Sequence, residues 1–259
     1  YITNFGKAHL EGFGGIQGVI EGKSELYQYL SINNKLAFIN LEDSIQVQKA
    51  ADLKFFSFGI KKENADVNII DVKANPFVEI NFSNLIIKSH LIGLYNANNI
   101  NAALTIGKYF GVDDIAIKEG LESYIPENNR SQLLSKGTNQ IILDAYNANP
   151  SSMKVAIENF LQLDNPNKIM ILGDMFELGD ASTQEHLEVL KLLLDKNEIQ
   201  CFFIGSAFYA NKTVTTHFHF YETFDSFSEY LKEIKIVNSV VLIKGSRGMA
   251  LERTLQFFS

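Results

Sequence analysis

The stretch IILDAYNANPSSM, residues 141–153, carries the clearest fold signal of the chain. Its apolar run, Ile141 to Leu143, has the length and composition of a buried strand. Polar residues follow, and an amphipathic segment then runs from Ser151 to Leu163. This order predicts a strand that ends in a polar turn and leads into a helix.

The same alternation continues downstream. It predicts strands at 169–172, 202–204, 218–221 and 240–243, and helices at 183–196, 226–234 and 249–258, with a short helix after residue 204. Apolar strands joined by amphipathic helices indicate an α/β fold with a Rossmann-like, doubly wound and mainly parallel sheet.

Polar clusters follow four of these strands. They are Asp144 to Asn149, Gly173-Asp174, Gly205-Ser206 and Lys244 to Arg247. Ligands of such sheets bind at the carboxyl ends of the strands, so these clusters are candidates for a binding edge. For any single cluster, an ordinary polar turn is an equally good explanation.

The upstream half has another pattern. β-Branched and aromatic runs between residues 36 and 92 are separated by Asn, Asp, Gly or Pro, which predicts hairpins. Helices are expected from Asn96 to Phe110, with Gly111 as a stop, and from Asp113 to Ser123. Turn formers at 126–129 then predict a boundary between domains 1–128 and 129–259.

Composition narrows the function. The chain has 259 residues, 46% of them hydrophobic, a formal net charge of -7 and a pI near 5.3, which argues against nucleic acid as a partner. A small-molecule substrate, a soluble cytoplasmic protein and no membrane span are expected. The single cysteine, Cys201, is expected to be a buried apolar filler. Since Tyr1 to Asn4 read as a strand end and a motif, the chain is expected to begin within a domain.

One motif is misleading. Gly18 to Ser24, sequence GVIEGKS, is similar to a phosphate-binding P-loop but is one residue short between the glycines. It also follows a glycine-rich turn instead of an apolar strand. A helix from Val19 to Leu30 is predicted instead, on which Lys23 could simply be a solvated lysine.

Five blocks of residues carry a family resemblance. They are ITNFGKAHLEGFG (2–14) with GKSEL (22–26), GLYNANN (93–99) with Ala102-Ala103, DAYNANPSSM (144–153), LGDMFELG (172–179) and KGSR (244–247). In this order they resemble the Mur ligases, enzymes of cell-wall synthesis. The resemblance implies the remainder of a P-loop-type central ATPase domain, followed by the Rossmann-like domain.

The resemblance also implies an activity. These ligases use ATP to convert a substrate carboxylate into an acyl phosphate, which an amine then attacks. The YNANP and GDMxELG forms resemble the branch that adds D-alanyl-D-alanine to UDP-N-acetylmuramoyl-tripeptide, with ATP and Mg²⁺ as cofactors. A monomer is expected.

Site residues follow from the matched positions. His9 matches the magnesium ligand of the family, and Lys23 matches a lysine carried as a carbamate, an anion able to hold magnesium. A satisfied structural side chain is the alternative for His9. As the resemblance implies, His9 and Lys23 would both act in catalysis and in metal binding.

Four positions match the nucleotide site. Asn96 and Asn99 share a helix face and suit adenine, Arg130 matches an arginine that reaches the ATP phosphates, and Asp144 matches a ribose-binding carboxylate. The alternatives are a helix cap for Asn96, a surface ion pair for Arg130 and a helix-entry turn for Asp144.

The dipeptide pocket is matched less strongly. Its candidates are Asn147, Asn149, Ser246 and Arg247, of which the arginine suits a carboxylate. Asp174 and Glu177 are expected to help build the wall of the site and are assigned no step.

The sequence also departs from the family. The family carries a P-loop, a magnesium-binding glutamate and a UDP-sugar domain upstream of the block at residue 2. None occurs in these 259 residues, so we expect this stretch alone to lack ligase activity. The alternatives are a ligase for another amino acid, including a folylpolyglutamate-type enzyme, and a non-catalytic module that binds a nucleotide or dipeptide.

Overall fold

The computed structural model describes residues 1–258, which form two compact units. The first unit comprises Tyr1–Gly6 and Phe13–Ile125. The second comprises Lys7–Gly12 and the chain from Pro126 onward. The short segment Lys7–Gly12 therefore belongs to the second unit, although in the sequence it separates two stretches of the first unit.

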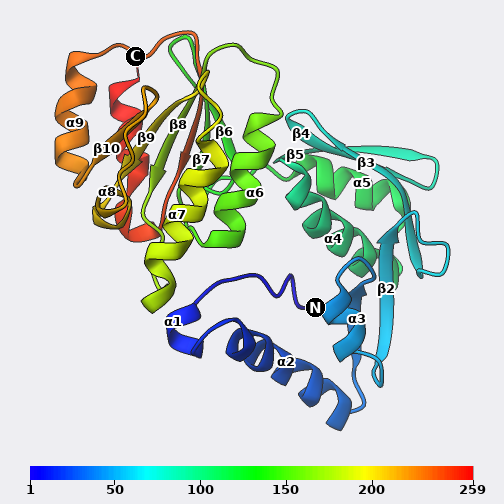
Figure 1. Cartoon of the computed structure of the whole chain (residues 1–259). Helices are drawn as coiled ribbons and strands as arrows, with labels where there is room; N and C mark the ends of the chain where they lie inside the picture. The colour runs from blue at the N-terminus through cyan, green and yellow to red at the C-terminus, as the bar shows by residue number, and fades with distance from the viewer. Residues whose placement is uncertain (259) are drawn as a thin grey trace. The chain divides into compact units, whose positions relative to one another are not determined.

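The first unit contains a five-stranded sheet of mixed direction (Figure 1). In spatial order its strands are β1 (Leu36–Asn40), β2 (Lys54–Ile60), β3 (Val67–Ala74), β4 (Phe77–Phe82) and β5 (Leu85–Ile92). The predicted hairpins are confirmed for β3 to β5, which pair antiparallel. They are wrong for β1 to β3, which pair parallel. The short helix α3 (Ser44–Lys49), capped by Asp43, provides the crossover from β1 to β2 that the strand pattern did not reveal.

Helices complete this unit. They are α1 (Leu10–Phe13), whose last residue belongs to this unit, α2 (Ile16–Ile32), the single turn η1 (Leu94–Asn96), α4 (Ala97–Tyr109) and α5 (Asp114–Ser123). α4 packs on β1 to β4, and α5 packs on β5. Gly111 follows α4 with φ of +76°, which confirms the predicted stop.

The rejection of the P-loop is confirmed. Gly18, Gly22 and Lys23 all lie inside helix α2. A Cβ atom at Gly18 would lie 1.8 Å from the carbonyl oxygen of Phe13, and one at Gly22 would lie 2.6 Å from the Phe13 ring. These glycines therefore make room for Phe13, so their spacing reflects packing.

The second unit contains a six-stranded, mainly parallel sheet, as predicted. In spatial order its strands are β10 (Phe218–Tyr221), β9 (Gln200–Ile204), β8 (Lys168–Gly173), β11 (Val240–Lys244), β7 (Asn139–Asp144) and β6 (Gln132–Lys136). Only β6, at one edge, pairs antiparallel, and the sequence pattern did not predict it. Ile141, Leu143 and Ala145 face one core cluster, while Ile142 is buried on the other side of β7.

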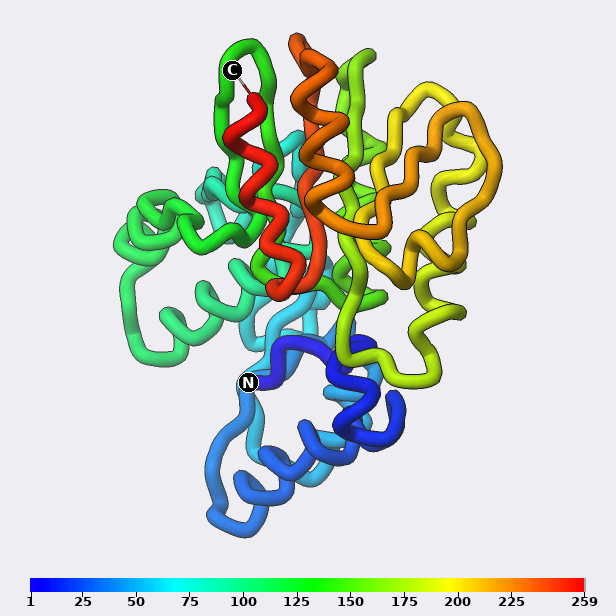
Figure 2. The backbone as a smooth tube through the Cα atoms, turned by 90° about the vertical axis from the view of Figure 1, so that its left-hand side faces the viewer, coloured from blue at the N-terminus to red at the C-terminus, as the bar shows by residue number. Residues whose placement is uncertain are grey.

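Helices cover both faces of this sheet (Figures 1 and 2). The elements are α6 (Pro150–Leu161), η2 (Gly179–Ala181), α7 (Ser182–Leu193), α8 (Ser206–Ala210), α9 (Phe224–Glu233), η3 (Arg247–Met249) and η4 (Leu251–Phe257). α6 packs on α7, whereas α9 packs on η4. The segment predicted as a helix at 249–258 is instead formed by 3₁₀ turns. Ala250, in a left-handed conformation, separates η3 from η4.

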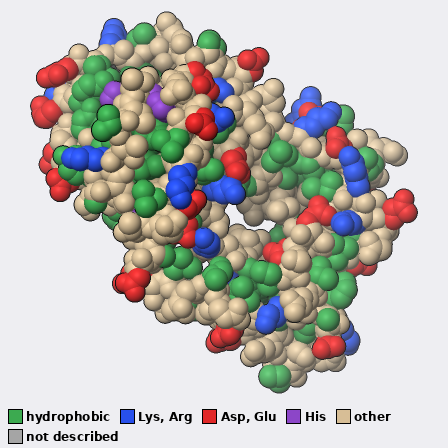
Figure 3. Space-filling view, in the orientation of Figure 1, with side chains coloured by type: hydrophobic (Ala, Val, Ile, Leu, Met, Phe, Trp, Pro, Cys, Tyr) green, Lys and Arg blue, Asp and Glu red, His purple; other side chains and the backbone are tan. Residues whose placement is uncertain are grey.

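Charged side chains of both signs lie on the surface. Acidic and basic side chains are interspersed on the visible face, without a continuous basic stripe (Figure 3). Within residues 1–258, no helix combines the length and apolar character needed to span a membrane.

Cys201 offers a simple test of the second core. Its side chain is fully buried, and burial together with nearby Glu198 raises the pKa of the thiol to about 12. We expect no reaction with a disulfide reagent at pH 8 in the native protein, because the reactive thiolate is both scarce and inaccessible. Cys201 should react after unfolding in urea; rapid labelling of Cys201 without urea would contradict this packing.

Candidate active site

A buried ion pair stands at the carboxyl edge of the second sheet. Lys244 and Asp144 occupy opposite positions on the parallel strands β11 and β7. The Lys244 ammonium donates to Asp144 Oδ2 at 2.6 Å and to the carbonyl of Asn147 at 3.3 Å. Asp144 Oδ1 accepts a bond from Ser131 N at 3.1 Å. Both oxygens of the predicted ribose ligand are thus engaged within this unit, so ribose binding stays a prediction.

Ser246 joins the loops that follow three strands. Its hydroxyl accepts from Phe176 N at 2.8 Å and donates to the Ala148 carbonyl at 3.3 Å, while its own N–H donates to the Asp174 carbonyl at 3.1 Å. The residue is only 2% exposed. Ser246 therefore fixes the loops after β7, β8 and β11 relative to one another.

Asp174 and His186 form the wall behind these loops. The Asp174 carboxylate accepts from the N–H groups of Ala207 and Phe208, both at 2.9 Å. His186 Nε2 accepts from Met175 N, and its Nδ1 donates to the carbonyl of Ser182. Burial lowers the pKa of His186, although the bond to Ser182 and the nearby Asp174 oppose that shift. A neutral imidazole is the form that fits both bonds.

A pocket of about 110 Å³ opens beside this wall. It is lined by Ala8, His9, Asn147, Ala148, Asn149, Phe176, Glu177, Ser246, Arg247 and Gly248. It brings together all four residues predicted for the dipeptide pocket and the predicted metal ligand His9. It also includes Glu177, which the sequence reasoning placed in the wall.

Two dipeptide candidates have their side chains occupied by internal bonds. Asn149 caps α6: its side chain accepts from Ser152 N at 2.9 Å, and Ser152 Oγ accepts from Asn149 N. Ser246 is occupied as described above. Arg247 differs, because its side chain is 60% exposed and one of its nitrogens donates to Glu252 at 3.2 Å. Its other N–H groups can serve a ligand.

His9 is held by Glu177. The Nδ1 atom of His9 contacts Glu177 Oε2, and the Glu177 carbonyl accepts from Glu11 N at 3.1 Å. His9 and Glu177 have φ of +54° and +61°, a conformation that is uncommon for residues other than glycine and that clusters at functional sites. The contact at Nδ1 leaves Nε2 of His9 available.

The residues predicted to bind the nucleotide make different contacts in the two units. In the first unit, Asn99 Nδ2 donates to Asn96 Oδ1 at 3.1 Å, so the two predicted adenine ligands do share one face. Asn96 occupies the N-cap position of α4, but its side chain makes no capping bond there. Its Nδ2 donates instead to the carbonyl of Ile92 at 2.8 Å. In the second unit, the Arg130 guanidinium lies 3.7 Å from the centroid of the Tyr146 ring. This cation–π stack, which the sequence reasoning missed, preorients the arginine.

Lys23 lies in the first unit, on helix α2. Its ammonium donates to the carbonyl of Asn4 at 2.9 Å. Partial burial lowers the pKa of Lys23, which increases the share of neutral amine. That neutral form is the one that combines with carbon dioxide to give a carbamate.

The residues present can supply part of a magnesium site. No group of three or more His, Cys, Asp or Glu suited to a metal occurs among residues 1–258. His9 with Glu177 nevertheless matches the arrangement in which a carboxylate orients a metal-bound imidazole. Magnesium commonly fills its remaining positions with water and substrate phosphates, so an incomplete protein shell fits this ion.

Two domain families account for this architecture. Residues 1–107 match the Mur ligase middle domain, and residues 129–247 match the Mur ligase glutamate ligase domain. The chain belongs to the Mur ligase family.

Within the family, two relatives carry the same name. The chain is 29% identical over 265 residues to the UDP-N-acetylmuramoyl-tripeptide--D-alanyl-D-alanine ligase of Bacillus subtilis, covering 98% of this chain and 58% of that protein. It is 30% identical over 261 residues to the enzyme of the same name from Haemophilus influenzae, covering 97% of this chain and 57% of that protein. The chain thus spans somewhat more than half the length of these relatives.

Solved structures of ligases named MurF have a similar fold. A crystal structure of MurF from Acinetobacter baumannii has a TM-score of 0.79 at 27% identity, covering 98% of this chain and 58% of that one. The MurF ligase of Thermotoga maritima, solved in complex with ADP, has a TM-score of 0.80 at 25% identity, covering 98% of this chain and 60% of that one.

The ion pair generates a stability prediction. Replacing Lys244 in Lys244→Met leaves the carboxylate of Asp144 largely buried without its cation, so the free energy of unfolding should fall by about 3–5 kcal/mol. Urea denaturation followed by circular dichroism measures this. The control Lys232→Met removes a solvent-exposed pair with Glu229 and should leave the unfolding midpoint almost unchanged. Equal midpoints for the two variants would contradict the assigned importance of the buried pair.

Proposed function

We propose that the protein is an ATP-dependent ligase that adds D-alanyl-D-alanine to UDP-N-acetylmuramoyl-tripeptide through an acyl phosphate. The observation that carries the proposal is the breadth of the match, because ligases of that name align with 97% or more of the chain. The pocket at the carboxyl edge supports it by gathering the residues that this branch of the family would use.

The charges of the pocket suit a dipeptide. A free dipeptide carries a carboxylate at one end and an ammonium at the other. Arg247 offers N–H groups in the planar geometry that binds a carboxylate at two points. Glu177 supplies a negative charge on the same pocket, and the amine that attacks the acyl phosphate belongs to the opposite end of the dipeptide.

ATP would be bound by the remaining candidates. In the first unit, we assign a role in adenine binding to Asn96 and Asn99, and a role in Mg²⁺ binding to Lys23 once carbamylated. In the second unit, we assign a role in ribose binding to Asp144 and in phosphate binding to Arg130, which stacks on Tyr146. In the same unit, His9 would contribute to Mg²⁺ binding. When bound, this ion neutralises the negative charge that phosphoryl transfer concentrates between nucleotide and carboxylate.

The substrate defines the expected setting. ATP and the UDP-linked tripeptide are nucleotides of the cytoplasm, so we propose a cytoplasmic enzyme of peptidoglycan precursor synthesis. We also propose that it acts as a monomer.

Two other functions remain as competitors. Structures of a diaminopimelate ligase and of a folylpolyglutamate synthase resemble the chain at 17% and 14% identity, which is evidence for the fold alone. A non-catalytic module that binds a nucleotide or dipeptide is the second competitor. The D-alanyl-D-alanine ligases of Bacillus subtilis and Haemophilus influenzae are more similar, at 29% and 30% identity, and therefore favour the proposal over both competitors.

Phosphate release tests the proposal. The full-length protein is incubated with ATP, Mg²⁺ and UDP-N-acetylmuramoyl-tripeptide, with D-alanyl-D-alanine, meso-diaminopimelate, L-lysine or L-glutamate as the acceptor. For meso-diaminopimelate and L-lysine, UDP-N-acetylmuramoyl-L-alanyl-D-glutamate is supplied as well. For L-glutamate, a reduced folate is supplied, because a folylpolyglutamate-type ligase extends a folate. Release should require D-alanyl-D-alanine and should be lost in Lys23→Ala. Activity with another acceptor alone would move the protein to another branch, and inactivity with all of them would favour the binding module.

Arg247 tests the assignment of the pocket. Arg247→Ala should raise KM for D-alanyl-D-alanine by about 10- to 100-fold, since a hydrogen bond to a charged group contributes about 1.5–3 kcal/mol. KM for ATP should not change. Arg253→Ala is the matched control, because Arg253 lies on the following turn and stacks on Phe224. A variant of Arg247 with normal KM for the dipeptide would remove this residue from the pocket.

A further inference from the structure

We propose that Lys7, Ser151 and Glu185 form a clasp that holds the segment Lys7–Gly12 on the second unit and so positions His9. None of the three touches the pocket described above, and they would act as positioning residues. The kinetic part of this inference rests on the proposed function, whereas its structural part does not.

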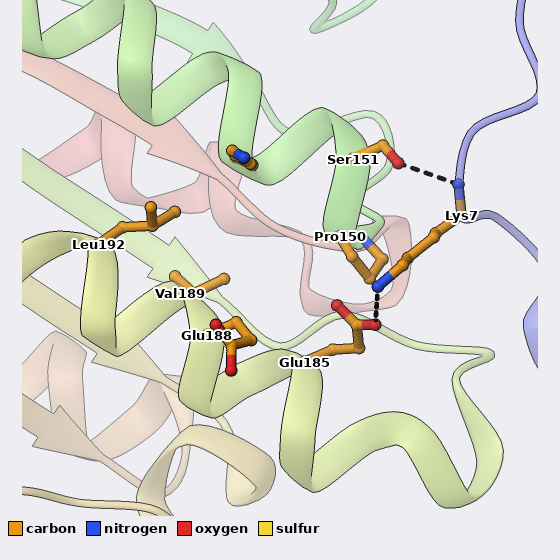
Figure 4. Close-up of a pocket in the computed structure, with 8 residues that line it drawn as sticks. Lys7, Pro150, Ser151, Glu185, Glu188, Val189 and Leu192 are labelled. Atoms are coloured by element: carbon orange, nitrogen blue, oxygen red, sulfur yellow. Dashed lines mark hydrogen bonds and ion pairs between the residues drawn. The ribbon is translucent and has the colours of Figure 1, made fainter.

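The clasp has two bonds from one residue (Figure 4). The backbone N–H of Lys7 donates to Ser151 Oγ at 2.9 Å, in the first turn of α6. The Lys7 ammonium donates to Glu185 Oε1 at 2.5 Å, in the first turn of α7. Lys7 thereby connects the beginnings of two neighbouring helices.

Burial makes the ion pair more than a surface contact. The side chain of Glu185 is only 11% exposed, whereas that of Lys7 is 49% exposed. The Lys7 side chain lines a cavity of about 310 Å³, whose apolar wall includes Pro150, Val189 and Leu192. A carboxylate this deeply buried depends on its cation, because an unpaired charge is costly to remove from water.

The clasp lies close enough to His9 to control it. His9 is two residues from Lys7, a distance of at most about 7 Å along the chain. On the other side, Glu11 N donates to the Glu177 carbonyl at 3.1 Å. The segment is therefore tied at both ends, with the positive φ of His9 between the ties. Release of Lys7 would leave the bond from Glu11 N to the Glu177 carbonyl and the contact between His9 and Glu177 as the remaining restraints on the imidazole.

Amide exchange measures the clasp directly. Exchange of the Lys7 and Glu11 amides is followed at single-residue resolution in the full-length protein and in Glu185→Gln, Ser151→Ala and Lys7→Met. Both amides should exchange about tenfold faster in Glu185→Gln, because local opening no longer breaks an ion pair. The Lys7 amide should respond most strongly to Ser151→Ala, which removes its acceptor.

Glu188→Gln is the matched control. Glu188 lies one turn further along α7 and lines the same cavity, but it is 51% exposed and pairs with Lys191. This variant should leave both amides unchanged. In addition, the exchanged pair Lys7→Glu with Glu185→Lys should recover part of the protection lost in either single variant.

The kinetic arm uses the same proteins. Glu185→Gln should lower kcat for dipeptide-dependent phosphate release by about tenfold with little change in KM for ATP, since a misplaced catalytic group acts mainly on the chemical step. Unchanged exchange at Lys7 and Glu11 in both Glu185→Gln and Ser151→Ala would overturn the clasp. If exchange responds but no dipeptide-dependent activity exists in the unsubstituted protein, the clasp stands and the proposed function fails.

Discussion

The pocket depends on the buried pair between Lys244 and Asp144. Parallel pairing places these residues opposite each other at the last position of β11 and β7. Burying both charges is favourable only when additional hydrogen bonds complete their shells. Ser131 N and the carbonyl of Asn147 provide those bonds, so the pair also fixes where the loop after β7 departs. The position of Asn147 beside the pocket follows from that restraint.

The other loops are fixed in the same way by uncharged groups. Ser246 bonds to the loops after β7 and β8, and Asp174 caps α8 after β9. Each contact uses a short side chain at a strand end to satisfy backbone groups that the sheet leaves unpaired. The polar clusters identified in the sequence are therefore both polar turns and the walls of a pocket; the two explanations considered for them are compatible.

Periodicity predicted most of the second unit because its strands are fully buried and regularly joined to helices. It failed where the apolar pattern was weak, and where the same pattern fits both parallel strands and hairpins. The edge strand β6 is only partly buried and has no continuous apolar run. In the first unit, parallel β1 and β2 have the same residue types as hairpin strands, and α3 is only 6 residues long. Within the candidate site, motif matching named His9, Arg247 and Glu177. It did not predict the contact between His9 and Glu177 or the pair between Arg247 and Glu252. The contact between Lys7 and Glu185 joins residues 178 positions apart, and no local pattern encodes it.

The four residues assigned to the dipeptide pocket divide by the chemistry still available to them. Asn149 and Ser246 use their side-chain oxygens in a helix cap and a loop junction, so they shape the pocket and contribute little to selection of the ligand. Asn147 and Arg247 are exposed. The internal bond of the Asn147 side chain uses its oxygen, and that of Arg247 uses one nitrogen, so other N–H donors of both side chains can bind a ligand. The carboxylate of the proposed dipeptide would require such donors. The bonds of Asn149 and Ser246 to the backbone, in contrast, keep these two side chains fixed. Discrimination between acceptors is therefore expected to lie with Arg247 and Asn147, on a frame set by Asn149 and Ser246.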